Sequence, residues 1–205
     1  MNAPARRRET LEAIARNTLK AYNPDLLTGE PQAVPIEKII EQYLGLSMEY
    51  HCLRKNGVIL GCTIFEGTLL PVYDEDIMDY TLIPVERGKI FLDESLLEED
   101  ASDGRLRFTC AHEAAHWMLD KEVYAGTGRA AAHVNPKTSL EENPATERQA
   151  DILASALLMP SGQVKKAFYR IHTQYQSDDI IRKLSGLFGV SKQAMGIFLR
   201  DHNMA

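Results

Sequence analysis

Two histidines and a glutamate with the spacing H-E-x-x-H are the residues of this 205-residue sequence best arranged for chemistry. They are His112, Glu113 and His116. Residues four apart in an α-helix lie on the same face, so the two imidazoles could share one metal ion. Glu113 would then lie beside a water that the ion activates. This spacing is typical of zinc hydrolases, in which the glutamate is the general base.

A third protein ligand is expected, because catalytic zinc sites usually combine three protein ligands with one open position. The segment 144–160 supplies Glu147 and Asp151, which are again four residues apart and share one helix face. We predict that Glu147 completes the metal site. A metal-binding histidine usually donates its second ring N–H to a carboxylate or carbonyl, and we predict that Asp151 is this acceptor. Taken alone, the pair would instead indicate a charged surface stripe.

The histidine pair itself has an alternative interpretation, a solvated helix face without a metal. Its neighbours are mostly apolar, which indicates a buried helix. These neighbours are Phe108, Ala111, Ala114, Ala115, Met118 and Leu119. Buried histidines need polar partners, and a metal ion supplies one. The sequence therefore favours the metal site.

Together, the two segments resemble the ImmA/IrrE family of metallo-endopeptidases. The resemblance is carried by R-x-R-F-T-x-A-H-E-x-x-H at residues 105–116 and by E-x-x-A-D-x-x-A-x-x-L-L-M-P at residues 147–160. It extends over nearly the whole chain, although only these two segments carry specific motifs. Three positions depart from the family's usual residues without removing a proposed ligand: Ala115, Gln149 and Leu153.

The resemblance implies a zincin-like fold and a bound metal, for which Zn²⁺ is expected and Mn²⁺ is the alternative. It also implies site-specific cleavage of a protein substrate, namely a helix-turn-helix repressor that controls a mobile element or a stress response. In this mechanism Glu113 takes a proton from water and passes it to the leaving amine. A further group that stabilises the oxyanion is expected. The candidates, each with an ordinary surface role available, are Tyr124, His133 and Arg148.

Substrate binding is expected to involve the sheet and the segment between the two motifs. We expect the substrate to bind as an extended strand along a sheet edge formed by residues 89–93. Residues 122–143 join the two ligand segments, and a loop of this length is expected either to gate the substrate or to be disordered.

Periodicity predicts the elements that position these residues. Helices are expected at residues 10–22 and 36–44, the second ended by Gly45, with a proline-rich loop at 24–35 between them. Strands are expected at residues 46–50, 58–65, 68–73 and 89–93. The predicted fold class is α+β, with a small, mostly antiparallel sheet packed against the H-E-x-x-H helix and further helices at both ends.

We expect two structural parts. Residues 1–160 would form the zincin-like peptidase domain, including the N-terminal helix and the sheet. Residues 161–205 would form a C-terminal helical subdomain, similar to a helix-turn-helix, packed on the catalytic body.

Composition limits the partners and the compartment. The net charge of −6 and the pI of about 5.5 give no general attraction to nucleic acid, so direct nucleic-acid binding is not expected. The three cysteines lack metal-binding spacing and are typical of reduced thiols in a cytosolic protein. With no secretory signal and no apolar run long enough to cross a bilayer, we expect a cytoplasmic protein that does not contact membranes. The oligomeric state stays open.

Two other functions use the same residues. A non-proteolytic regulator could bind a repressor or DNA through its C-terminal helices and hold a purely structural metal, which normally needs four protein ligands. No histidine or cysteine is an obvious fourth ligand, although His133 is available. A hydrolase of short peptides, such as an aminopeptidase, would share the three ligands.

Overall fold

The computed structural model describes residues 6–53, 59–98, 103–124 and 144–204, and its fold is α+β, as predicted. The helices are α1 (Arg8–Tyr22), α2 (Asp25–Thr28), α3 (Ile36–Lys38), α4 (Asp103–Tyr124), α5 (Pro144–Leu158), α6 (Ser161–Ile171), α7 (Ser177–Phe188) and α8 (Lys192–Asp201). A π-helical turn, Ile39–Tyr43, continues α3, and a 3₁₀ turn, Glu94–Leu97, precedes α4. The strands are β1 (Ser47–His51), β2 (Gly61–Ile64), β3 (Thr68–Asp74), β4 (Asp79–Val85) and β5 (Lys89–Asp93).

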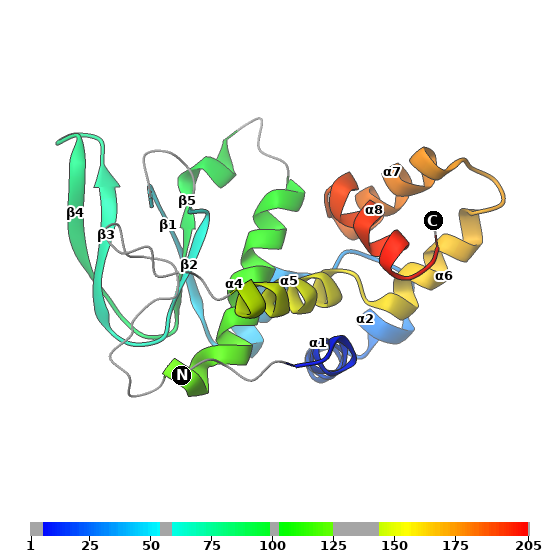
Figure 1. Cartoon of the computed structure of the whole chain (residues 1–205), viewed down its shortest axis with the longest axis horizontal. Coiled ribbons are helices and arrows are strands. Elements are labelled where there is room, and N and C mark those ends of the chain that lie inside the picture. Colours follow the sequence, from blue (N-terminus) through cyan, green and yellow to red (C-terminus); the bar gives the residue numbers. More distant parts are fainter. Residues whose placement is uncertain (1–5, 54–58, 99–102, 125–143, 205) are drawn as a thin grey trace.

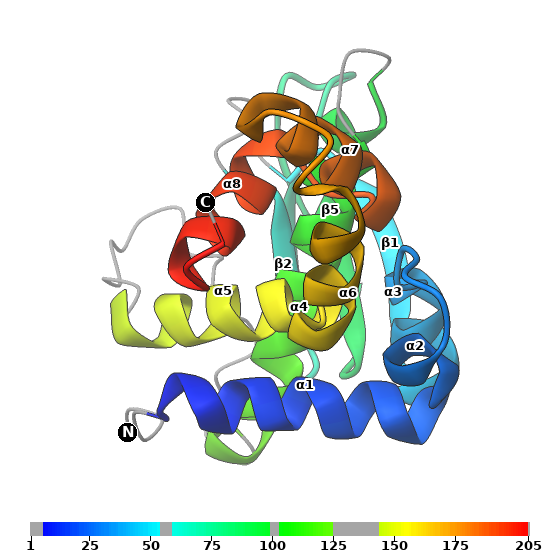
Figure 2. The same cartoon turned by 90° about the vertical axis from the view of Figure 1, so that its right-hand side faces the viewer.

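Strands and helices occupy different parts of the long axis of the molecule. The β3–β4 hairpin lies at one end, α4 and α5 lie in the middle, and α6, α7 and α8 lie at the other end (Figure 1). α1 runs alongside α5 (Figure 2). Within the described residues, no helix is long and apolar enough to cross a membrane.

The strands form a mixed three-stranded sheet and a separate hairpin. The sheet has the order β1-β5-β2, in which β5 is parallel to β1 and antiparallel to β2, whereas β3 and β4 pair only as an antiparallel hairpin. The prediction that residues 89–93 form an edge strand for the substrate is therefore wrong, because β5 is the central strand. Its apolar residues Ile90, Phe91 and Leu92 are fully buried, as expected of a strand covered on both faces.

Two further elements differ from the prediction. The predicted loop at residues 24–35 contains the short helix α2, and the sequence analysis missed β4. β4 contains Pro84 and exposes Leu82 and Tyr80, so it lacks the usual pattern of a half-buried strand. The predicted helix at 36–44 is confirmed, and Gly45 follows it with a φ of 68°, the left-handed conformation that glycine adopts most easily.

The core surrounds α4 on most sides. Small side chains on this helix, such as Cys110, Ala111 and Ala114, are fully buried and allow the sheet and α5 to approach closely. The hydrophobic cluster around them extends from Leu11 in α1 to Leu199 in α8. α4 is therefore held by packing along most of its surface, which fixes the side chains that it carries.

The C-terminal helices pack against the start of α4. α7 and α8 are joined by a turn through Gly189. A Cβ atom at Gly104 of α4 would lie only 2.6 Å from the backbone nitrogen of Ser191 in that turn. Arg107 donates to the carbonyl of Gly189 at 3.0 Å and to that of Val34 at 2.6 Å. The division into a domain of residues 1–160 and a subdomain of residues 161–205 stays a prediction.

Candidate metal centre

The two histidines of the H-E-x-x-H motif lie on one face of α4, as their spacing predicts. The ring centroids of His112 and His116 are 4.6 Å apart, and their Nε2 atoms are 3.0 Å apart. His116 is fully buried, and the side chain of His112 is 17% exposed. Both rings therefore present the same nitrogen to one point beside the helix.

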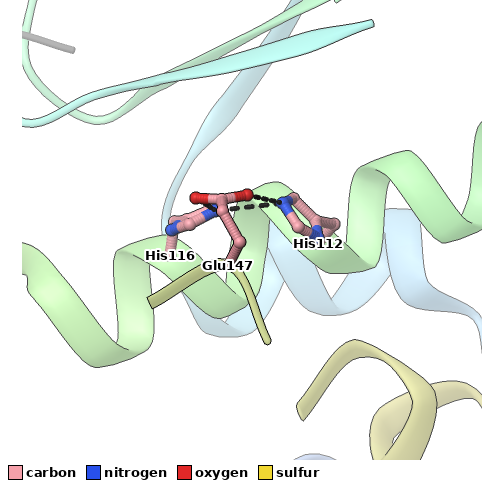
Figure 3. Close-up of side chains that lie close together, drawn as sticks. All are labelled: His112, His116 and Glu147. Carbon is pink, nitrogen blue, oxygen red and sulfur yellow. Dashed lines mark hydrogen bonds and ion pairs between the residues drawn. The ribbon is translucent and has the colours of Figure 1, made fainter. Parts of the chain in front are cut away.

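Glu147 reaches that point from α5. Its Oε2 lies 3.2 Å from Nε2 of His112, and its Oε1 lies 3.4 Å from Nε2 of His116. Figure 3 shows this carboxylate facing both rings. The ligand atoms of the three residues all lie within 4.8 Å of one another. Two imidazoles and one carboxylate are a donor set that zinc uses in hydrolases, so these residues fit a metal ion.

A carboxylate also lies beside the second ring nitrogen, Nδ1, of each histidine. Asp151, also on α5, places Oδ1 3.0 Å from Nδ1 of His112, which is the contact that the sequence predicts. Asp120 places Oδ2 3.2 Å from Nδ1 of His116, and its side chain is buried. The sequence analysis missed Asp120, although its position four residues after His116 was a usable signal. Such contacts fix the ring orientation, so that both Nε2 atoms face Glu147.

Carboxylates surround the two histidines, although both histidines are largely buried. Burial opposes a charge on His112, but the carboxylates of Asp151 and Glu147 outweigh it and raise the pKa of this histidine to about 10. Burial likewise opposes a charge on His116, but Asp120 and Glu147 raise its pKa to about 9. The same carboxylates that attract a proton attract a metal cation, because both reduce the repulsion between buried negative charges.

Glu113 faces β2. Its side chain is only 3% exposed, and the hydroxyl of Thr63 lies 2.7 Å from its Oε2 and 3.0 Å from its backbone oxygen. A Cβ atom at Gly61 would lie 2.7 Å from Oε1 of Glu113, so the absence of a side chain there makes room for the carboxylate. The sequence analysis missed Thr63, because the sequence does not indicate which strand of the predicted sheet lies against Glu113.

The structure assigns none of the three candidate oxyanion donors to the site. Arg148 is exposed and lies about 100° around α5 from Glu147. His133, the side chain of Tyr124 and the segment 125–143 lie outside the described residues, so the gating prediction for 122–143 stays a prediction.

One comparison with known proteins covers this site. The family model described as the IrrE N-terminal-like domain, a peptidase family, matches residues 91–200. The match covers 110 of the 205 residues, which is just over half of the chain, and it includes Glu113 and all three residues of the metal group. No curated protein matches the chain.

Proposed function

The chain belongs to the IrrE N-terminal-like family of peptidases, and from this premise we propose that it is a zinc-dependent endopeptidase. His112, His116 and Glu147 would hold the metal. The observation that carries the proposal is the convergence of their three ligand atoms beside α4. When bound, the metal would supply a Lewis acid and activate water near neutral pH. Mn²⁺ is the alternative ion.

Glu113 is the proposed general base. It follows the first histidine directly, and its carboxylate is held by the hydroxyl of Thr63, which leaves it little freedom to turn away. It would take a proton from the attacking water and deliver that proton to the amine that leaves when the peptide bond breaks. Asp120 and Asp151 would act as positioning residues that keep the two imidazoles in place.

The proposed substrate is an intracellular helix-turn-helix repressor, and the proposed compartment is the cytoplasm. The resemblance to the ImmA/IrrE family supports both. The structural-metal alternative is less well supported, because the metal group comprises three side chains in the described part of the chain, whereas a structural zinc site normally has four.

The test is cleavage of a candidate repressor. The wild-type protein and the Glu113→Gln variant would be loaded with zinc and incubated with the repressor encoded nearest to its gene, and the products would be identified by intact-mass analysis. We expect one cut with the wild-type protein and none with the variant or after chelation of the metal. Equal cutting by both proteins would contradict the assignment of Glu113. Hydrolysis of short unblocked peptides, with the repressor left intact, would instead indicate an aminopeptidase.

A further inference from the structure

A second concave site lies among the helices of the other half of the molecule. A pocket of about 570 Å³ is bounded by α1, α5, α6 and α8, whose arrangement can be followed in Figure 2. None of the three proposed metal ligands lines it, although Asp151 and Phe108 line it and also lie next to His112. Its volume is within the range of sites that bind small molecules.

The interior of this pocket is mainly apolar. The side chains that form it come from three different helices and from the segment after α5. They include Leu19 of α1, Ile152 and Ala156 of α5, Met159, and Ile197 and Phe198 of α8. An apolar molecule would leave water on entering such a space, which favours binding.

The start of α6 contributes polar groups to the pocket lining. α6 begins there: its N-cap residue, Pro160, provides no side-chain acceptor, and Ser161 and Gly162 of its first turn line the pocket. The first N–H groups of a helix have no intrahelical partner and attract anions. Gln163 also lines the pocket and is only 3% exposed, yet its Oε1 has no hydrogen-bond partner in the described structure. Buried amides are rarely left in this state.

One arginine of the pocket lining has no ion-pair partner in the described part of the chain. The other arginine of the lining, Arg8, lies 2.7 Å from Asp201, whereas Glu12 lies 3.7 Å from His202 and Asp151 lies 3.0 Å from His112. Arg16 also lines the pocket and has no ion pair among the residues that the structure describes. A ligand with one negative charge would give Arg16 an ion-pair partner.

From these features we propose that the pocket binds a small amphipathic monocarboxylate. The carboxylate would lie at the start of α6, within reach of Arg16 and the side-chain amide of Gln163, which can turn to offer its N–H₂ group. The apolar body would lie between α1, α5 and α8. This site goes beyond the proposed peptidase activity and does not depend on it.

Binding of octanoate by the full-length, metal-loaded protein tests the proposal, with isothermal titration calorimetry as the measurement. We expect saturable binding at one site. Octanol has the same chain without the charge, and we expect it to bind at least fivefold more weakly. Arg16→Gln should reduce that difference. Equal affinity for octanoate and octanol, or no saturable binding of octanoate, would overturn the proposal.

A matched pair of glycine variants locates the binding site. A Cβ atom at Gly162, which lines the pocket, or at Gly186 of α7, which does not, would meet nothing within 4 Å, so both positions accept a side chain. Gly162→Leu should weaken octanoate binding at least tenfold, whereas Gly186→Leu should leave it unchanged. Equal effects of the two variants would place binding elsewhere and refute the assignment.

The metal centre is the competing site for a carboxylate, because carboxylates are themselves zinc ligands. The titration is therefore repeated after the metal has been removed by a chelator. Binding that persists supports the helical pocket, and binding that disappears with the metal overturns the proposal. If Gly162→Leu leaves octanoate binding intact but blocks repressor cleavage, the pocket accepts a segment of the protein substrate instead of a small carboxylate.

Discussion

α4 and α5 support the two histidines of the metal centre in different ways. The partner of His116 is Asp120, which lies one turn further along α4 and has a side chain that is 2% exposed. The partner of His112 is Asp151, which comes from α5 and has a side chain that is 57% exposed. One support is thus local and shielded from water, whereas the other depends on the docking of a second helix and stays open to solvent.

This difference predicts which side of the site is more rigid. Interactions between charges are stronger in a shielded environment and are weakened by solvent and salt at the surface. We therefore expect the α4 side to fix the site and the α5 side to tolerate more change. Glu147 is the exception on α5, because it contacts both histidines.

The proposed general base, Glu113, belongs to the α4 side alone, and its removal should have the largest effect. Glu113→Gln keeps the shape of the side chain but removes the group that accepts a proton. We expect cleavage to fall by about a hundredfold to ten-thousandfold, with the metal content unchanged, as measured by intact-mass kinetics and elemental analysis. Glu98→Gln, at an exposed position, is the control. Cleavage by Glu113→Gln at the wild-type rate would show that α4 does not supply the base.

The proposed metal site takes its ligands from both helices. Glu147→Ala should lose the metal almost completely, because two imidazoles alone leave a catalytic zinc site one ligand short. Elemental analysis of the purified protein measures this. Arg148→Ala, at the neighbouring exposed position on α5, should keep a full complement of metal. If the two variants hold equal amounts, α5 contributes no ligand and the site has been assigned wrongly.

The two supporting aspartates test the comparison directly. Asp120→Asn and Asp151→Asn keep the size of each side chain and remove its charge. We expect metal affinity to fall by about tenfold to a hundredfold, with Asp120→Asn at the upper end because its contact is shielded. Competition with a metal-binding dye measures both. A larger loss for Asp151→Asn would reverse the proposed order of the two sides.

The sequence predicted the parts of the site that depend on helix spacing. The pairs His112 and His116, and Glu147 and Asp151, follow from a spacing of four residues, and Asp120 could have been found in the same way. Thr63 could not, because it meets Glu113 across fifty residues of chain through the packing of β2 on α4. Spacing defines a helix face, but it does not say which strand lies against it.

The order of the strands in the sheet could not be predicted from residue spacing. Residues 89–93 were correctly predicted as a strand but wrongly placed at an edge, because alternation within a strand says nothing about its neighbours. The continuous apolar run Ile90–Leu92 was the available signal, since a run of this kind indicates a covered strand. The predicted substrate strand is paired on both sides, whereas β2 lies at an edge of the sheet and reaches Glu113.

Removing the hydroxyl of Thr63 should change the reaction rate by less than removing either aspartate's charge changes the metal affinity. This hydroxyl supports Glu113, on the α4 side only. Thr63→Val keeps the shape and removes the hydrogen bond to Glu113, so the carboxylate can turn away from its working position. We expect kcat to fall by about tenfold, the size of one hydrogen bond to a charged group, with KM and metal content unchanged. Thr63→Ser, which restores the hydroxyl, should recover most of the rate. Loss of metal in Thr63→Val would show a structural role instead.

A last expected effect concerns stability instead of cleavage, namely the pH dependence of folding without metal. Both histidines have folded-state pKa values, about 10 and about 9, that lie above the ordinary value of 6.5. A raised pKa stabilises the folded state below the unfolded pKa, and this contribution is lost as the pH rises through the folded pKa. The free energy of unfolding of the metal-free protein should therefore decrease between about pH 6.5 and pH 10. Urea unfolding across this range measures it.

Comparing the aspartate variants in that experiment separates the two sides once more. Asp151→Asn removes the charge beside His112, and Asp120→Asn removes the one beside His116, so each should flatten part of the pH profile. The solvent-exposed pair at Asp151 should lose its influence in high salt, whereas the shielded pair at Asp120 should keep it. Equal sensitivity to salt would mean that the two carboxylates support their histidines in the same environment, and the distinction between a local, shielded side and a docked, open side would not hold.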